Sequence, residues 1–448
     1  MAIAIRWVNH ASFVFECGDV RLLTDPWLFG SAFHNGWDLL CKTHFDVSEF
    51  ADISHIWFSH EHPDHFSPPV LKEIPEEIRS GITVIFQETD DKKVVSYCMA
   101  LGFTVQELAN HGWYELTPEC RVMCGKVPFF DSWLLLEAIH SSEEMIRILN
   151  ANDCVVDGEA IASDIFNYTG TVDLLLTQFS YAIWEGNPDE VERRRASAAE
   201  KLERVRLQIE TFQPAYTIPF ASFIYFSHEE NFYCNDSINT VRDAHSFIRQ
   251  ETASQPVVLY PEERWVVGSI HESEASLQKY DQDYDLGKKP LRKSEPVAVD
   301  QLALHAQDYI ERMTDKNSPL LIRIMSMPVF GYFQTLKFYL TDLRKTVEFD
   351  MRDGLQMKSK SDDESKSEMS ESHIMLSSES LAYIFQNDWG FDTLTVNGRF
   401  QASQANYKRM MKALFLGPLN NTGRYLRPKT FFEPAFILRA LSKLRKLG

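Results

Sequence analysis

The sequence predicts a mixed α/β protein in which two sheets are covered by helices and carry metal-ligand residues at one edge. Two observations support this class. Short apolar and β-branched runs are intermixed with amphipathic helical segments over roughly the first 220 residues. One of the apolar runs ends abruptly in three histidines and an aspartate within residues 60–65.

The first part of the chain is predicted to be rich in short strands. Period-two runs at 2–8, 12–16 and 20–24 resemble a meander, with turns at 9–10 and 18–19. Further strands are expected at 54–59, 82–87, 103–107, 121–124 and 133–138, and helices at 69–73 and 92–101.

After residue 154 the pattern changes. Residues 172–177 and 214–219 are strand-like, and 189–211 are expected to form a long amphipathic helix with Leu202, Val205 and Ile209 on one side. We expect a metal-binding domain over residues 1–290 and a separate C-terminal α+β region over 296–448. Within that region, residues 355–373 are expected to be a disordered charged loop, because its central part contains almost nothing apolar.

Composition narrows the classes of function. The chain has 448 residues, 44% of them hydrophobic, and a net charge of −19. This acidity argues against nucleic acid as a partner, because phosphate binding needs a basic surface. No apolar run is long enough for a membrane span, and the N-terminus lacks the pattern of a signal peptide. Seven irregularly spaced cysteines are typical of free thiols. The cytoplasm is therefore the expected compartment.

The run from Ser59 to His65 carries the clearest chemical signal. In a strand, alternate side chains point the same way, so His60 and His62 can face one point as the strand ends. Asp64 and His65 follow on the loop and can turn back toward that point. Imidazole and carboxylate are ligands of zinc, iron and manganese. The alternative, a surface loop that happens to be rich in histidine, requires four ligand-type residues to follow a buried strand by chance.

Two more segments can complete a metal site. Asp153 ends an apolar run and could bridge two metals, although an aspartate that caps a turn is the alternative. His228 also ends a β-rich run, but a lone histidine in such a position is often structural.

These segments resemble the metallo-β-lactamase superfamily, whose metal loop has the H-x-H-x-D-H pattern of residues 60–65. The resemblance is closer to the metallo-β-lactamase-like part of the CMP-N-acetylneuraminate hydroxylase family. It rests on N-H-A-S-F-V-F at 9–15, L-L-T-D-P-W-L-F-G-S-A-F at 22–33, H-E-H-P-D-H-F-S-P-P-V-L-K at 60–72, F-D-S-W-L-L-L-E at 130–137, I-L-N-A-N-D-C at 148–154 and Q-P-A-Y-T-I-P-F-A-S-F-I-Y-F-S-H at 213–228. It covers about the first 250 residues and implies an αββα sandwich, to which the C-terminal α+β region is an addition.

The resemblance also implies a ligand set for two divalent metal ions, iron or zinc. His60 and His62 would hold one metal, Asp64, His65 and His228 the other, and Asp153 would lie between them.

Four further positions follow from the same resemblance. The family usually supplies another histidine where this chain has Val127. Asp131 is a candidate oxygen ligand in its place, the alternative being a capping acid before a strand. His10 and Asp25 match positions near the metal loop, where both would lie behind the ligands and Asp25 would orient a ligand imidazole by hydrogen bonding. For His10 a turn histidine is an equal alternative, and Asp25 could instead shape a turn.

A departure from the family concerns electron transfer. The hydroxylase family carries a Rieske domain, which needs C-x-H and C-x-x-H pairs. Cys41 and His44 form a C-x-x-H pair, but the upstream Cys17 is followed by Gly18 and Asp19, with no histidine. We therefore expect no Rieske cluster in this chain, and electrons from a separate protein.

Two kinds of enzyme fit these features. The first is a monooxygenase-like metalloenzyme that hydroxylates a sugar nucleotide or a similar small polar or anionic substrate. The second is a hydrolase acting on a lactone, an amide or a phosphodiester, in which the metals lower the pKa of a bound water and Asp64 or Asp153 orients it. A non-catalytic binding module is a third reading, disfavoured by the intact ligand run. The wider resemblance favours hydroxylation.

Overall fold

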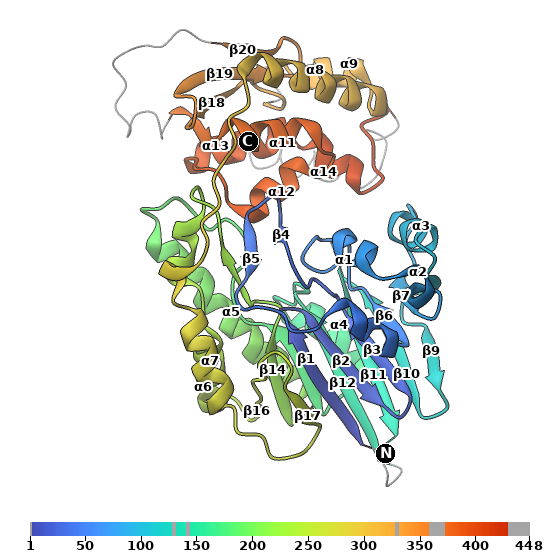
Figure 1. The fold of residues 1–448 in the computed structure, drawn as a ribbon. Coiled ribbons are helices and arrows are strands. Elements are labelled where there is room, and N and C mark those ends of the chain that lie inside the picture. The colour runs from blue at the N-terminus through green and yellow to red at the C-terminus, as the bar shows by residue number, and fades with distance from the viewer. Residues whose placement is uncertain (1, 128–130, 140–143, 328–330, 358–371, 429–448) are drawn as a thin grey trace. The chain divides into compact units, whose positions relative to one another are not determined.

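The computed structural model describes residues 2–127, 131–139, 144–327, 331–357 and 372–428 (Figure 1). The chain divides into two compact units. The first contains residues 1–182, 192–227 and 235–290, and the second contains 183–191, 228–234 and 291–448. The two short segments 183–191 and 228–234 therefore group with the C-terminal part of the chain, although they lie within the range 1–290 in sequence.

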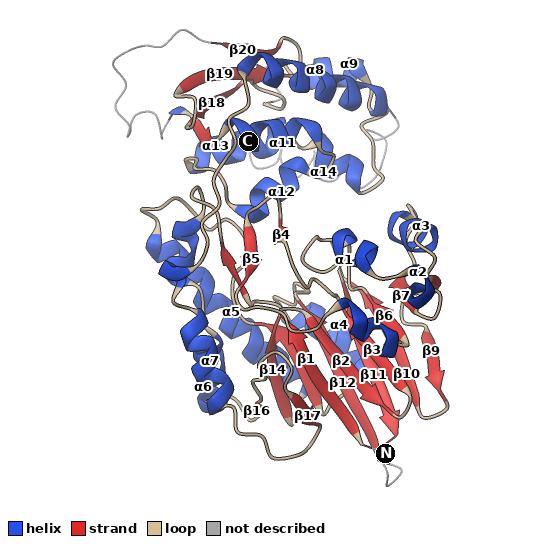
Figure 2. Cartoon of the chain, in the orientation of Figure 1, coloured by secondary structure: helices blue, strands red, loops and turns tan. Residues whose placement is uncertain are grey.

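Two seven-stranded sheets form the first unit (Figure 2). The first has the order β17-β1-β2-β3-β6-β7-β8. Its pairs are antiparallel from β17 to β3 and parallel from β3 to β8. Its strands are β1 (Ile3–Asn9), β2 (Ser12–Cys17), β3 (Val20–Thr24), β6 (His55–Trp57), β7 (Thr83–Gln87), β8 (Thr104–Leu108) and β17 (Arg264–Val266).

The second sheet has the order β16-β14-β13-β12-β11-β10-β9. It is parallel from β16 to β12 and antiparallel from β12 to β9. Its strands are β9 (Trp113–Thr117), β10 (Cys120–Lys126), β11 (Ser132–Ile139), β12 (Met145–Asn152), β13 (Leu174–Gln178), β14 (Tyr216–Phe220) and β16 (Gln255–Pro256). A smaller sheet of the same unit joins β4 (Ser31–Ala32), β5 (Trp37–Leu39) and β15 (Ile224–Phe226).

The apolar core explains why helices cover the outer face of each sheet. Along β2, Phe13 and Phe15 belong to the core that also contains the second sheet, whereas Val14 belongs to a separate core on the other face. This alternation follows from the period of two in a strand. The helices of this unit are α1 (Pro68–Glu73), α2 (Glu76–Arg79), α3 (Lys93–Ala100), α4 (Glu159–Thr169), α5 (Val191–Phe212), α6 (Val241–Glu251) and α7 (Glu274–Asp283), with 3-10 turns at Val47–Asp52 and Leu286–Lys288. A further 3-10 turn, Phe232–Ser237, has residues in both units.

The predicted αββα sandwich is confirmed. Residues of α1 and α3 pack in the outer core of the first sheet, and residues of α4, α5 and α6 pack against the second. The predicted helix at 189–211 is α5, which buries Val205 and Ile209. Several elements were not expected, among them β5, β9, β17, α4, α6 and α7. Strand β9 has no fully buried residue, so its sequence lacks the alternation that reveals a strand.

The second unit has mixed α+β structure, as predicted. Its sheet has the order β20-β19-β18-β21, formed by β18 (Leu336–Leu340), β19 (Lys345–Asp350), β20 (Gly354–Met357) and β21 (Ile374–Leu376). Its helices are α8 (Val299–Lys316), α9 (Pro319–Met325), α11 (Ser378–Gln386), α12 (Gly390–Asn397), α13 (Gln404–Ala413) and α14 (Leu416–Asn421). Of the predicted charged loop at 355–373, residues 355–357 lie in β20 and 358–371 lie outside the described residues.

A buried charge network ties the second unit together internally. The fully buried Arg399 donates from Nε to Glu230 Oε2 at 3.0 Å and from Nη2 to Glu379 Oε2 at 2.6 Å. Within the described residues, no helix of either unit is both long and apolar enough to cross a membrane.

Candidate metal centre

The ligand-type residues gather at one edge of the two sheets because several chain segments turn there. Strands β3 and β6 are parallel neighbours, so Asp25 and the loop at 58–67 both leave the carboxyl ends of adjacent strands. Strands β11 and β12 are antiparallel, which brings the beginning of β11, next to Asp131, beside the end of β12, next to Asp153. The turn between β1 and β2 adds His10.

The first group of possible ligands consists of His60, His62 and Asp131. His60 Nε2 lies 2.8 Å from His62 Nδ1 and 3.7 Å from Asp131 Oδ1. His60 and Asp131 are buried. The structure therefore brings together the predicted pair of imidazoles with the carboxylate that was a candidate for the missing histidine.

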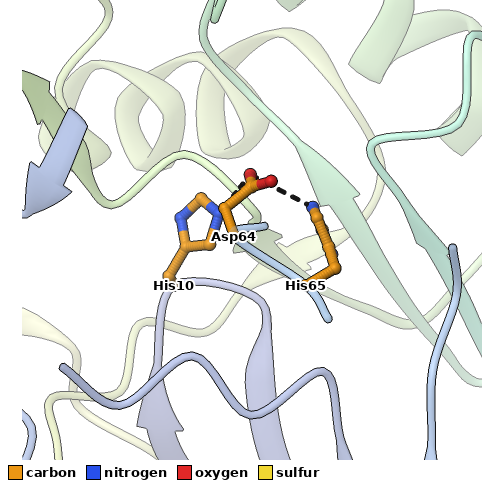
Figure 3. A group of neighbouring side chains, drawn as sticks. All are labelled: His10, Asp64 and His65. Atoms are coloured by element: carbon orange, nitrogen blue, oxygen red, sulfur yellow. Dashed lines mark hydrogen bonds and ion pairs between the residues drawn. The ribbon is translucent and has the colours of Figure 1, made fainter. Parts of the chain in front are cut away.

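The second group consists of His10, Asp64 and His65 (Figure 3). The Oδ2 atom of Asp64 lies 3.3 Å from Nε2 of His10 and 3.3 Å from Nε2 of His65. All three side chains are buried. The sequence expectation placed His10 near the ligands, and the structure places its ring against a predicted ligand.

Asp153 lies between the two groups. Its Oδ2 is 3.4 Å from His65 Nε2 and 3.8 Å from His60 Nε2, and these three residues form a third group of possible ligands. This position suits the bridging role that the resemblance implies.

The donor atoms fit a divalent metal. Within the described residues, the buried atoms His65 Nε2, Asp64 Oδ1 and Asp153 Oδ1 have no hydrogen-bond partner. Buried polar groups are normally hydrogen-bonded, and such exceptions call for an explanation such as an ion. In each ligand group the imidazole nitrogens and carboxylate oxygens lie within 4.8 Å of one another, which is an arrangement that a bound metal ion would explain.

Asp25 supports the ligands from behind. Its Oδ1 accepts a hydrogen bond from the Ser59 backbone N–H at 2.8 Å, and its Oδ2 accepts from Ser59 Oγ and Asn152 Nδ2, each at 2.8 Å. The same Oδ2 lies 3.0 Å from His65 Nδ1. Asp25 is fully buried, and its φ of 38° is a left-handed value that aspartate tolerates better than most residues. The carboxylate can thus fix the orientation of the His65 ring.

The electrostatics of the centre follow from burial and from its excess of carboxylates. Burial lowers the pKa of His60 well below its usual value, which keeps this imidazole neutral, as metal binding requires. For His65 burial acts in the same direction, but the charges of Asp64 and Asp153 outweigh it and raise the pKa. Burial and the neighbouring charge of Asp153 raise the pKa of Asp131. A bound cation would compensate these buried carboxylates.

Two predicted positions belong to none of the three ligand groups. Val127 is buried, and its backbone N–H donates to Asp131 O at 3.0 Å. His228 belongs to the second unit, where it forms a bridge with Arg292 and its Nδ1 lies 3.5 Å from Glu230 Oε2. Its role as a ligand stays a prediction.

Sequence reasoning missed two residues of the centre. Ser59 Oγ lies 2.9 Å from His60 Nδ1, and Asn152 Nδ2 contacts Asp25. Ser59 directly precedes the first ligand, and Asn152 directly precedes Asp153. Adjacency to a ligand was therefore the available signal, but only the contacts with Asp25 distinguish these residues from their neighbours.

Fold and site together define a metallo-β-lactamase-type protein with a cluster able to hold metal ions. The beta-lactamase superfamily domain matches residues 4–114, and the chain therefore carries a domain of this superfamily. Over 257 residues it is 27% identical to the cytidine monophosphate-N-acetylneuraminic acid hydroxylase of Mus musculus, covering 54% of this chain and 42% of the relative. The match thus spans less than half of that relative's length.

Solved structures are also similar. One is CmlA, described as a diiron beta-hydroxylase from Streptomyces venezuelae, with 14% identity, a TM-score of 0.39 and coverage of 59% of this chain and 53% of that chain. Another is a metallo hydrolase from Ignicoccus hospitalis, with 12% identity, a TM-score of 0.42 and coverage of 60% and 100%.

Proposed function

We propose that this protein is a two-metal, iron-dependent monooxygenase that hydroxylates a sugar nucleotide or a similar small polar substrate. The observation that carries the proposal is the composition of the ligand groups. Each of the three groups contains two histidines and one aspartate. Two imidazoles and one carboxylate with open positions form the donor set typical of non-haem iron oxygenases. The distant similarity to a sugar-nucleotide hydroxylase over half of the chain supports the choice of substrate.

The chain's own residues would hold and orient the metals. His60, His62 and Asp131 would bind one ion, Asp64 and His65 the other, and Asp153 would contact both. We retain His228 as a further candidate ligand of the second ion.

Iron bound there would supply dioxygen activation. The balanced reaction inserts one oxygen atom of O2 into a substrate C–H bond and releases the other as water, consuming two electrons and two protons. We propose that a separate electron-transfer protein delivers those electrons. Asp25 contributes indirectly, because its hydrogen bonds hold the His65 ring and the backbone of Ser59 in place.

Isotope incorporation tests the proposal. The full chain is loaded anaerobically with Fe(II), reduced with dithionite and exposed to ¹⁸O2 with CMP-N-acetylneuraminic acid and a panel of other sugar nucleotides. Mass spectrometry should find one ¹⁸O atom in a product. The variant His60→Gln should lose this signal. The matched control His55→Gln should keep it, because His55 lies on β6, the strand that precedes the metal loop, but in none of the ligand groups.

A hydrolase is the outcome that would replace this proposal. Zinc-loaded protein that cleaves a lactone, an amide or a phosphodiester, combined with iron-loaded protein that incorporates no ¹⁸O, would identify hydrolysis as the reaction. In that case Asp64 or Asp153 would orient the attacking water. Absence of bound metal in the purified and reconstituted protein would refute both chemistries.

A further inference from the structure

We propose that His10 is a direct ligand of the second metal position, together with Asp64 and His65, rather than a residue that only supports the ligands. This inference rests on the part of the proposed function that concerns metal binding, and it does not depend on which reaction follows. It adds a ligand from the β1–β2 turn, far from the H-x-H-x-D-H segment in sequence.

The distances within the group favour a shared metal over a hydrogen bond. Ligand atoms that lie about 2.0–2.2 Å from one ion are about 2.8–3.6 Å from each other at angles between 90° and 109°. Asp64 Oδ2 is 3.3 Å from both imidazole nitrogens, which falls within that range. A charge-assisted hydrogen bond between nitrogen and oxygen is usually shorter, about 2.7–2.9 Å.

The direction of the His10 ring supports the same assignment. His10 Nε2 and His65 Nε2 both approach the same carboxylate oxygen, so two imidazole donors and one carboxylate donor converge (Figure 3). A residue that merely orients a ligand would contact an atom that does not face the metal, as Asp25 does at His65 Nδ1.

The surrounding chain also fixes the position of the His10 ring. Its φ is 40°, its backbone N–H donates to Asn9 Oδ1 at 2.9 Å, and its carbonyl accepts from the Ala221 N–H at 3.1 Å. The Trp27 ring packs edge-on at 5.6 Å. The ring is 2% exposed, yet its Nδ1 has no partner among the described residues. Coordination through Nε2 would leave Nδ1 unpaired, so the support from this environment is that the turn and the indole ring fix the imidazole with Nε2 toward Asp64.

Metal titration of two variants separates the two roles. Co(II) serves as the probe, its binding to the full chain is followed by visible absorption, and the stoichiometry is measured by mass spectrometry of the metal. His10→Ala removes both the imidazole and its contact with Asp64. His10→Gln keeps a hydrogen-bond donor of similar length but replaces the imidazole by an amide nitrogen, which is a poor ligand. His55→Gln is the matched control on β6.

We expect the wild type and the control to bind two equivalents of cobalt. In both His10 variants the first equivalent should bind as in the wild type, and the second should be weakened by more than about 100-fold, beyond the usual effect of a supporting residue. The assignment would be overturned if His10→Gln binds the second equivalent as the wild type does, or if it loses both equivalents. A smaller loss of affinity for the second equivalent in His10→Ala would overturn it as well. A wild type that binds fewer than two equivalents would instead count against the proposed function itself.

Discussion

Replacing Asp25 by asparagine should damage the centre without touching a metal ligand. The change is nearly isosteric but removes one acceptor oxygen and the charge. In the structure the carboxylate faces four donors, which are the Ser59 N–H and Oγ, Asn152 Nδ2 and His65 Nδ1. The least harmful orientation of the new amide places its NH2 group against the Ser59 N–H. The opposite orientation would place the NH2 group against the other three donors.

The magnitude follows from that count. At least one buried N–H loses its acceptor, which costs about 1–3 kcal/mol, and the remaining hydrogen bonds lose their charge assistance. We therefore expect the metal-free protein to lose about 2–4 kcal/mol of stability in the first unit. Because a neutral amide oxygen holds the His65 ring less strongly than the carboxylate did, the second metal should bind about 10–100-fold more weakly.

Hydrogen exchange of the first unit measures the stability change, and cobalt titration measures the affinity. Asp46→Asn is the matched control, because Asp46 is an exposed N-cap residue and asparagine caps equally well. If Asp25→Asn behaves like this control in both measurements, Asp25 does not organise the site and the reasoning from its four contacts is wrong.

Three further changes test the packing and charges of the fold. Arg399→Leu should destabilise the second unit by about 3–5 kcal/mol, because it leaves the carboxylates of Glu230 and Glu379 without their buried partner, and urea denaturation followed by limited proteolysis measures this. Gly125→Ala should cost about 1–3 kcal/mol in the first unit, read by hydrogen exchange, since the new methyl group would overlap the Trp133 ring. Burial raises the pKa of Asp392 to about 6, so the folded chain binds a proton that the unfolded chain releases near pH 4. The contribution of this group to stability should therefore fall as pH rises from about 4 to 6, and Asp392→Asn should remove that slope from the melting temperature.

Each of these predictions has a control and a contrary result. Arg242→Leu breaks a partly exposed ion-pair cluster and should cost less than about 1 kcal/mol, so equal losses for Arg242 and Arg399 would contradict the argument from burial. In Gly287→Ala the new methyl group meets no close atom, so the stability should hardly change. An unchanged stability in Gly125→Ala would show that the core around Trp133 can rearrange to accept the methyl group. If the melting temperature of Asp392→Asn depends on pH as in the wild type, other groups cause that dependence.

Much of the fold could be predicted from the sequence because local patterns carry it. The meander of β1 to β3, the strand before the metal loop and the long helix α5 all follow from apolar periodicity. Strand β9 was not predicted, because a strand with no fully buried residue lacks such a pattern. The sequence also did not predict that residues 183–191 and 228–234 belong to the second unit. Their membership depends on contacts with segments that are far away in the chain.

The metal loop shows where the sequence suffices. His60, His62, Asp64 and His65 lie within six positions, so one strand end and one loop present them together, and residue type with spacing identifies them as ligands. The similarity of the surrounding segments to a known family extended this set to Asp153. Local order along the chain thus determined the fold class and the chemical nature of the site.

Only the tertiary structure decided how the donors are grouped. His10, Asp25, Asp131 and Asn152 come from four separate segments of the chain, and the pairing of strands β3 with β6 and β11 with β12 brings Asp25, Asp131 and Asn152 to the same edge as the metal loop. Side-chain convergence at that edge assigns His10 to Asp64 and Asp131 to His60, which no spacing in the sequence encodes. The physical reason is that ligand geometry is measured in ångströms between atoms, whereas sequence separation constrains those distances only within one strand, helix or turn.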